Sequence, residues 1–167
     1  MDSLAVYYHP LFIEHETGDH VENKARLVVA RQVLAGSGLD LEWIEPEPAS
    51  IEAIARVHDP AYIDSVRKTA ADGGGWLDWE TAVSPRSYEA ARVAAGAGIA
   101  AIDRALSGGQ KAFMLVRPPG HHACRSRGKR LLVRNWGAYR NPHQPHGHLL
   151  PDALDAIGAP ADVFLVE

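Results

Sequence analysis

Short apolar runs and helical stripes alternate along most of the chain. Three runs have the length and composition of buried strands, at residues 4–8, 41–44 and 112–116. Between them lie segments with apolar side chains at helical spacing, at residues 22–34, 51–57, 60–71 and 85–107. Strands that alternate with helices are typical of an α/β fold.

The longest of these segments predicts a helix over residues 85–107 that packs against the sheet. Its apolar side chains recur at helical spacing, at Tyr88, Ala91, Ala95, Ile99, Ile102 and Leu106. Many small residues between them allow the helix to approach a sheet closely. We expect this stripe to face the core.

The pattern changes after Ala123. Residues 121–151 contain no acidic side chain, are rich in arginine, histidine and proline, and follow neither helical nor strand periodicity. A short helix and the strand Val163–Val166 are expected after Pro151. We therefore divide the chain into a main part at 1–123, an irregular basic segment at 124–150 and a helix–strand remnant at 151–167.

Composition narrows the class of protein. The chain has 167 residues, which suits one domain, and a net charge of −4, which gives no general case for nucleic acid or an anionic membrane as partner. Its single cysteine excludes an internal disulfide and favours a reducing compartment. No signal peptide or membrane-spanning run is visible, so we expect a cytoplasmic protein.

The candidate chemistry lies where the strand at 112–116 ends. Arg117-Pro-Pro-Gly-His-His-Ala123 forms a turn that presents two adjacent histidines, His121 and His122. In open α/β sheets, sites lie at the carboxyl ends of strands. Two imidazoles there can share a proton-transfer task at neutral pH, which predicts a general acid/base pair.

That string resembles the signature of the histone deacetylase and acetylpolyamine amidohydrolase superfamily. Earlier segments also resemble it in order and spacing: Tyr8-His9-Pro10 with His15, Gly18, His20, Glu22 and Arg26-Leu27, then Asp78-Trp79-Glu80-Thr81 with Ser84 and Tyr88-Glu-Ala-Ala91. Val21 stands where the family has proline, and Glu80 where it has a second aspartate. The resemblance covers about residues 5–123.

The resemblance implies a three-layer α/β/α sandwich around a mainly parallel sheet. It also implies hydrolysis of acetyl-lysine or acetylpolyamine amides by zinc-activated water. On that resemblance His121 and His122 are the acid/base pair, and Asp78 and Gly120 contact the substrate. The resemblance also implies that Arg26 is buried near the pocket, in the internal channel that takes the acetate product.

The sequence departs from the family downstream. No Asp-x-His follows residue 123, and neither the later aspartate nor the Gly-Gly-Tyr segment of the family is found. We therefore expect no metal site, an incomplete sandwich and no activity of this chain alone. We hypothesise that the central segment of the family's domain has been lost and that residues 124–150 are junction or out-of-frame sequence. The strand at 112–116 would then lack a neighbour, the strand at 163–166 would dock in the gap or stay free, and the exposed sheet edge would favour self-association. The alternative function is a non-catalytic fragment that pairs with a full-length relative.

Three weaker signals fall in or beside the basic segment. His143, His146 and His148 could gather around a metal ion, but no cysteine or carboxylate joins them. Cys124 beside His122 could be a nucleophile, but no third group orients it. Basic and aromatic side chains at 125–140 could stack on nucleic acid. For each, an irregular solvated segment is the favoured interpretation.

Overall fold

Four parallel strands form the main sheet of the protein. The computed structural model describes residues 3–78, 81–108, 110–119, 125 and 163–165. The strands are β1 (Leu4–Tyr7), β2 (Leu41–Ile44), β5 (Ala112–Met114) and β6 (Val163–Leu165). Their order is β2-β1-β5-β6, and every neighbouring pair is parallel.

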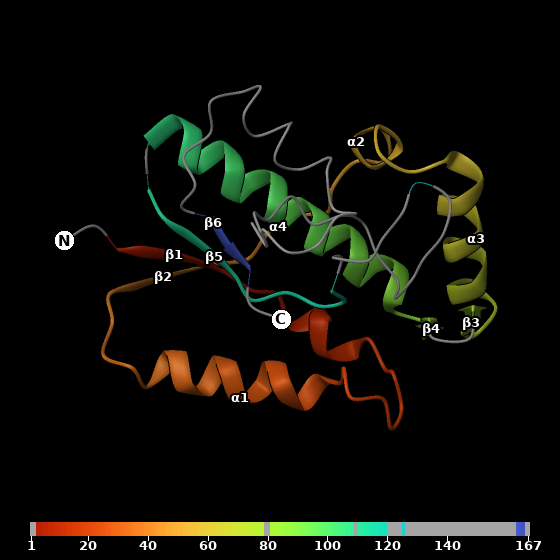
Figure 1. Ribbon diagram of the computed structural model, residues 1–167, viewed down its shortest axis with the longest axis horizontal. Helices are drawn as coiled ribbons and strands as arrows, with labels where there is room; N and C mark the ends of the chain where they lie inside the picture. The colour runs from red at the N-terminus through yellow and green to blue at the C-terminus, as the bar shows by residue number, and fades with distance from the viewer. Residues whose placement is uncertain (1–2, 79–80, 109, 120–124, 126–162, 166–167) are drawn as a thin grey trace, which may run out of the picture.

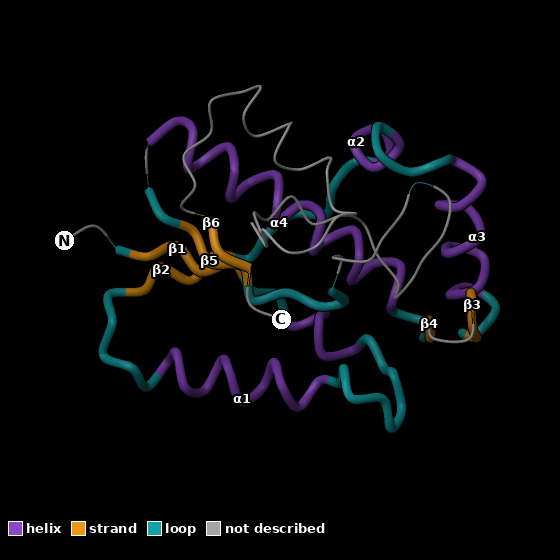
Figure 2. Tube along the Cα trace, viewed as in Figure 1, coloured by secondary structure: helices purple, strands orange, loops and turns teal. Residues whose placement is uncertain are grey.

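Helices lie on both faces of this sheet. Figure 1 shows α1 (Lys24–Ala35) on one side and α4 (Ser87–Gly108) on the other, and Figure 2 shows the strands between them. One core cluster joins β1 and β5 to both helices, with Leu27 from α1 and Ala94 from α4 among its buried members. The predicted α/β fold around a mainly parallel sheet is confirmed.

The buried face of α4 differs from the predicted stripe. Ile99 and Leu106 are 38% and 45% exposed, while alanines at 90, 94, 97, 101 and 105 are buried against the sheet. Small side chains let the helix axis approach the strands closely, and long branched side chains would hold it away. The predicted stripe is therefore wrong at those two positions.

The remaining elements are η1 (Pro10–Glu14), α2 (Ile51–Ala55), α3 (Pro60–Ala71), β3 (Gly75–Asp78) and β4 (Thr81–Val83). Of these, η1 packs into the same core as the main sheet, and the others pack together around the first half of α4. Val66 and Ala70 of α3 pack with Val83 and Ala91, and Ile54 of α2 packs with Ala95. The antiparallel β3–β4 hairpin is a second, two-stranded sheet that the apolar pattern did not predict.

β6 changes one expectation about the sheet. We expected the strand at 112–116 to lack a neighbour, with 163–166 either docked in the gap or free. In the structure β6 pairs with β5 in parallel register, Phe113 opposite Phe164, so that edge of β5 is covered. Among the described residues, no helix has both the length and the apolar character needed to cross a bilayer.

Candidate active site

The candidate site lies at the carboxyl edge of the parallel sheet. β1 leads through His9 into η1 and the loop before α1, and β5 leads through Leu115 and Val116 to Arg117. Since β1 and β5 are parallel neighbours, both segments leave the sheet at the same edge. The topology thus brings residues 9–23 beside Arg117, although about a hundred residues separate them in sequence.

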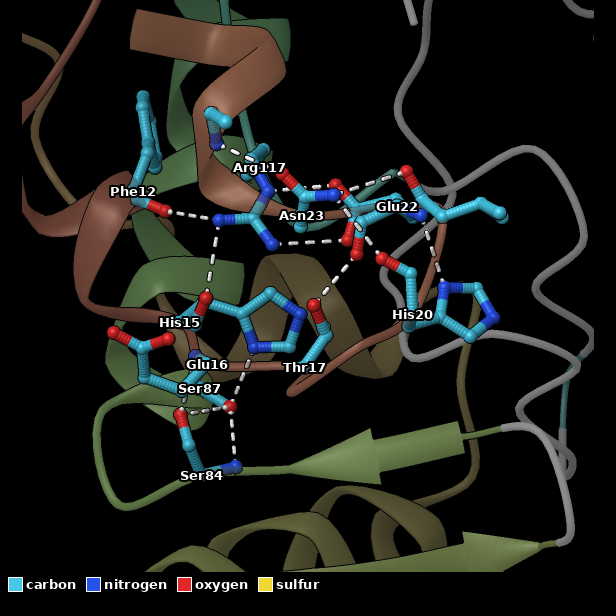
Figure 3. Close-up of polar contacts among 12 residues, drawn as sticks. Phe12, His15, Glu16, Thr17, His20, Glu22, Asn23, Ser84, Ser87 and Arg117 are labelled. Carbon is cyan, nitrogen blue, oxygen red and sulfur yellow. Dashed lines mark hydrogen bonds and ion pairs between the residues drawn. The ribbon is translucent and has the colours of Figure 1, made fainter.

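Arg117 is the centre of the polar network at this edge (Figure 3). Its Nε donates to Glu22 Oε1 at 2.6 Å and its Nη2 donates to Glu22 Oε2 at 3.0 Å. Its Nη1 donates to the carbonyl oxygens of Phe12 at 3.2 Å and His15 at 3.0 Å. The guanidinium therefore makes a two-pronged ion pair on one edge and binds two backbone carbonyls with its third nitrogen.

This ion pair is removed from water. The side chains of Arg117 and Glu22 are 4% and 11% exposed. The other salt bridges between described side chains are far more exposed. A buried charge is tolerated only when its partners satisfy it, and here the carboxylate and the carbonyl oxygens do so.

A second set of hydrogen bonds holds the same loop to the start of α4. His15 Nδ1 and Ser87 Oγ share a hydrogen bond of 2.7 Å, and the Ser84 backbone N–H donates to Ser87 Oγ at 2.7 Å. The Glu16 N–H donates to Ser84 Oγ at 3.0 Å. The loop is thus fixed from two sides, by Arg117 after β5 and by Ser84 and Ser87, which lie just before and at the start of α4 (Figure 3).

His15 is neutral at pH 7 in this setting. Burial, and after it the positive charge of Arg117, lowers the pKa of its imidazole to about 4 from the usual 6.5. Its side chain therefore serves as a neutral hydrogen-bonding group, and its backbone carbonyl accepts a hydrogen bond from the Arg117 guanidinium.

Asp78 ends β3, in the hairpin that leads into this network. It lies opposite Thr81 in the β3–β4 pairing and is half-buried. β4 ends at Val83, directly before Ser84 of the loop-fixing serines. The predicted role of Asp78 in substrate binding stays a prediction.

The other predicted site residues fall in two groups. Gly120, His121 and His122 lie outside the described residues, as do His143, His146, His148 and Cys124. Arg26 is described and lies exposed on α1. Our expectation that Arg26 is buried is therefore wrong, because it lies on the solvent side of the helix while Leu27 turns toward the core. Its role in a product channel stays a prediction.

The sequence analysis did not predict the buried ion pair between Arg117 and Glu22. Both were noticed only as letters of two motifs, Glu22 in the first loop and Arg117 in the string before the histidines. The available signal was an arginine directly after an apolar strand, where a charged side chain enters the core and requires a buried partner.

The described residues do not form a zinc site. No group of three or more His, Cys, Asp or Glu side chains within the described ranges could hold a metal ion. Two loop histidines already use Nδ1 locally, His9 for the Leu11 N–H and His20 for the Glu22 N–H.

The fold and the site together define a class: an α/β protein whose polar network lies at the carboxyl ends of parallel strands. The histone deacetylase domain matches residues 20–129. A probable deacetylase of Methanothermobacter thermautotrophicus is 33% identical over 132 residues, which is 79% of this chain and 40% of that protein. The polyamine deacetylase HDAC10 of Homo sapiens is 34% identical over 139 residues, 76% of this chain and 21% of that protein.

A solved structure agrees with these relatives. The crystal structure of the HDA15 HD domain superposes with a TM-score of 0.75 at 27% identity, over 81% of this chain and 41% of that one. The chain belongs to the histone deacetylase family, within the histone deacetylase and acetylpolyamine amidohydrolase superfamily. It spans less than half the length of the curated relatives that it matches.

Proposed function

We propose that this chain carries the substrate-contacting and acid/base part of a deacetylase site that acts on N-acetyl amides of lysine side chains or polyamines. The observation that carries the proposal is the family match across residues 20–129, which includes the His121–His122 turn. The buried anchoring of Arg117, four positions before His121, supports it further.

The reaction requires two proton transfers. Water attacks the acetyl carbonyl carbon, the amide C–N bond breaks, and acetate and a free amine result. In a complete site of the family, one imidazole of the His121–His122 pair would accept the proton of the attacking water, and the other would donate a proton to the leaving nitrogen. Asp78 and Gly120 would hold the acetylated chain beside the pair.

The family's zinc ion would polarise the carbonyl group when bound, and we propose that this chain does not supply its ligands. The described residues contain no group of three or more His, Cys, Asp or Glu side chains that could hold a metal ion, and the sequence after residue 123 contains no Asp-x-His. We therefore propose that the chain recognises acetylated amines and does not hydrolyse them alone.

The test uses the purified chain with N-acetyl-lysine peptide and N-acetylputrescine as probes. Metal content is measured by mass spectrometry, binding by saturation-transfer NMR, and hydrolysis by acetate release with added zinc. We expect binding of the acetylated peptide over its unacetylated form, weaker binding by Asp78→Asn, zinc well below one per chain and no acetate release.

Two results would contradict the proposal. Equal binding of acetylated and unacetylated peptide would remove the deacetylase assignment. One tightly held zinc per chain, with acetate release that His122→Ala abolishes, would show a complete site and would direct attention to His143, His146 and His148. The alternative, pairing with a full-length relative, relied on an open edge beside β5, which β6 occupies; we do not propose it.

A further inference from the structure

We propose that Glu22 and Arg117 are positioning residues for the His121–His122 pair. Their ion pair joins the loop after β1 to the segment that leaves β5, and the histidines follow on that segment. This inference rests on the proposed function, since it concerns the acid/base pair named there, but it is tested by the state of the imidazoles and not by turnover.

The first step is that the guanidinium of Arg117 is held in one orientation. The carboxylate of Glu22 occupies Nε and Nη2, and the carbonyl oxygens of Phe12 and His15 occupy Nη1. A planar fork bound on two edges cannot turn without losing several hydrogen bonds in a place that water does not reach. A lysine has no such fork and would fix only the charge.

The second step is that little rotational freedom remains between Arg117 and the histidines. Pro118 is fully buried, and Pro118 and Pro119 each have a fixed φ. Arg117 and Pro118 each precede a proline, which restricts their own backbone angles. The orientation set at Arg117 is therefore carried along Pro118 and Pro119, which are the last described residues before the histidines in sequence.

The third step is that the partner side of the ion pair is itself anchored. The Thr17 hydroxyl donates to the Glu22 carbonyl at 2.6 Å, and the Glu22 N–H donates to His20 Nδ1 at 3.0 Å. His15 ties the same loop to Ser87 of α4. Arg117 is thus held in a fixed position relative to both the sheet and α4.

The fourth step concerns what such a pair supplies. Desolvation offsets most of the Coulombic gain of a buried ion pair, so apolar side chains of similar size often stabilise a fold equally well. A fixed geometry is what apolar side chains cannot supply. Arg117 of this pair lies four positions before His121, the first of the candidate acid/base residues, where a fixed backbone geometry would help to orient them.

The experiment compares imidazole signals by NMR in the whole ¹⁵N-labelled chain. Ring signals of His121 and His122 are assigned with His121→Gln and His122→Gln, and His58, buried after α2, is the internal reference. We expect Glu22→Gln and Arg117→Lys to shift the ring resonances and protonation midpoints of His121 and His122, while His58 keeps its own.

If Glu22→Gln does not fold, two less disruptive variants test the positioning role. Thr17→Val removes the hydrogen bond to the Glu22 carbonyl without leaving a buried charge. Thr69→Val is the matched control, because Thr69 donates to the Ser65 carbonyl within α3, at 2.9 Å. We expect Thr17→Val to shift the two ring signals, Thr17→Ser to restore them, and Thr69→Val to leave them unchanged.

Unshifted His121 and His122 signals in folded Glu22→Gln and Arg117→Lys would overturn the inference. If Glu22→Gln is unfolded, equal signals in Thr17→Val and Thr69→Val would do the same. The outcome is separate from the proposed function: shifted signals in a chain that ignores acetylated peptide would keep the positioning role and reject the deacetylase site.

Discussion

Loss of the Glu22 carboxylate would leave Arg117 as a buried cation without the counter-ion that it has among the described residues. Removing one member of a buried pair costs about 3–5 kcal/mol. We expect Glu22→Gln to lower the free energy of unfolding by that amount, as measured by urea denaturation followed by circular dichroism. Glu16→Gln is the control, because it breaks the exposed pair with Lys24 and should cost about 0–1 kcal/mol. Equal losses in the two variants would contradict a buried, energetically coupled pair.

His15 should make the stability of the fold depend on pH. Its pKa of about 4 in the folded chain is below the usual 6.5, so between these values the unfolded chain binds more protons. Stability is therefore complete above about pH 6.5, falls as the pH is lowered, and levels off below about pH 4. The full change is on the order of 3 kcal/mol.

The measurement is a series of urea titrations from pH 8 to pH 4 on the wild type and on His15→Asn. Asparagine keeps a polar atom for Ser87 and does not titrate in this range. The difference between the two profiles isolates His15 from the carboxylates that titrate nearby. A constant difference across the whole range would show that the pKa of His15 is not lowered by folding.

Sequence reasoning found the residue types of the site more easily than their burial. The string around His121 and His122 is local, and its letters are visible in any single sequence. The partnership of Glu22 with Arg117 depends on two strands being neighbours, which no local pattern reports. Arg26 shows the opposite error: a motif match suggested burial, while its place on α1 puts it in solvent.

At the scale of elements, the close approach of α4 to the backbone of residues 47–49 predicts a strong effect of a substitution at Gly96. A Cβ at this position of α4 would lie 1.8 Å from the Glu47 carbonyl oxygen and 3.0 Å from the Ala49 nitrogen. We expect Gly96→Ala to lower the free energy of unfolding by about 1–3 kcal/mol or more, because backbone must move. Gly108, at the end of the same helix, has nothing within 4 Å, so Gly108→Ala should be neutral or stabilising by up to about 1 kcal/mol. Thermal unfolding of both variants checks this, and a stable Gly96→Ala protein would refute the close approach.

The elements that were predicted well have strong local signals. The strand at 41–44 has its predicted bounds, and the helix that begins at Ile51 is capped by Ser50, whose Oγ accepts the Ala53 N–H. The β3–β4 hairpin was missed because its strands are short and irregular in register. The face of α4 was misjudged because alanine is weakly apolar in a periodicity count, yet it packs best where a helix must approach a sheet.

At the scale of the molecule, the sheet connects segments from both ends of the chain. β1 follows the N-terminus, β5 lies past the middle, and β6 comes from residues 163–165. The network at the carboxyl edge depends on β1 and β5 staying in register, since one carries the loop with Glu22 and the other carries Arg117. Whatever holds β5 in the sheet therefore also supports the candidate site.

β6 is one such support, and its removal gives a test at this scale. A chain that stops after residue 160 leaves the backbone groups of β5 on that edge without a partner strand. We expect faster hydrogen exchange over Ala112–Met114 and a greater tendency to associate, while the β1–β2 pairing keeps its protection.

A chain that stops after Leu165 is the matched control, because it loses the last two residues and keeps β6. Exchange by mass spectrometry and light scattering measure both effects. Unchanged protection of β5 in the shorter chain would show that β6 contributes nothing to the sheet, and that β1 alone holds β5 and Arg117 in place.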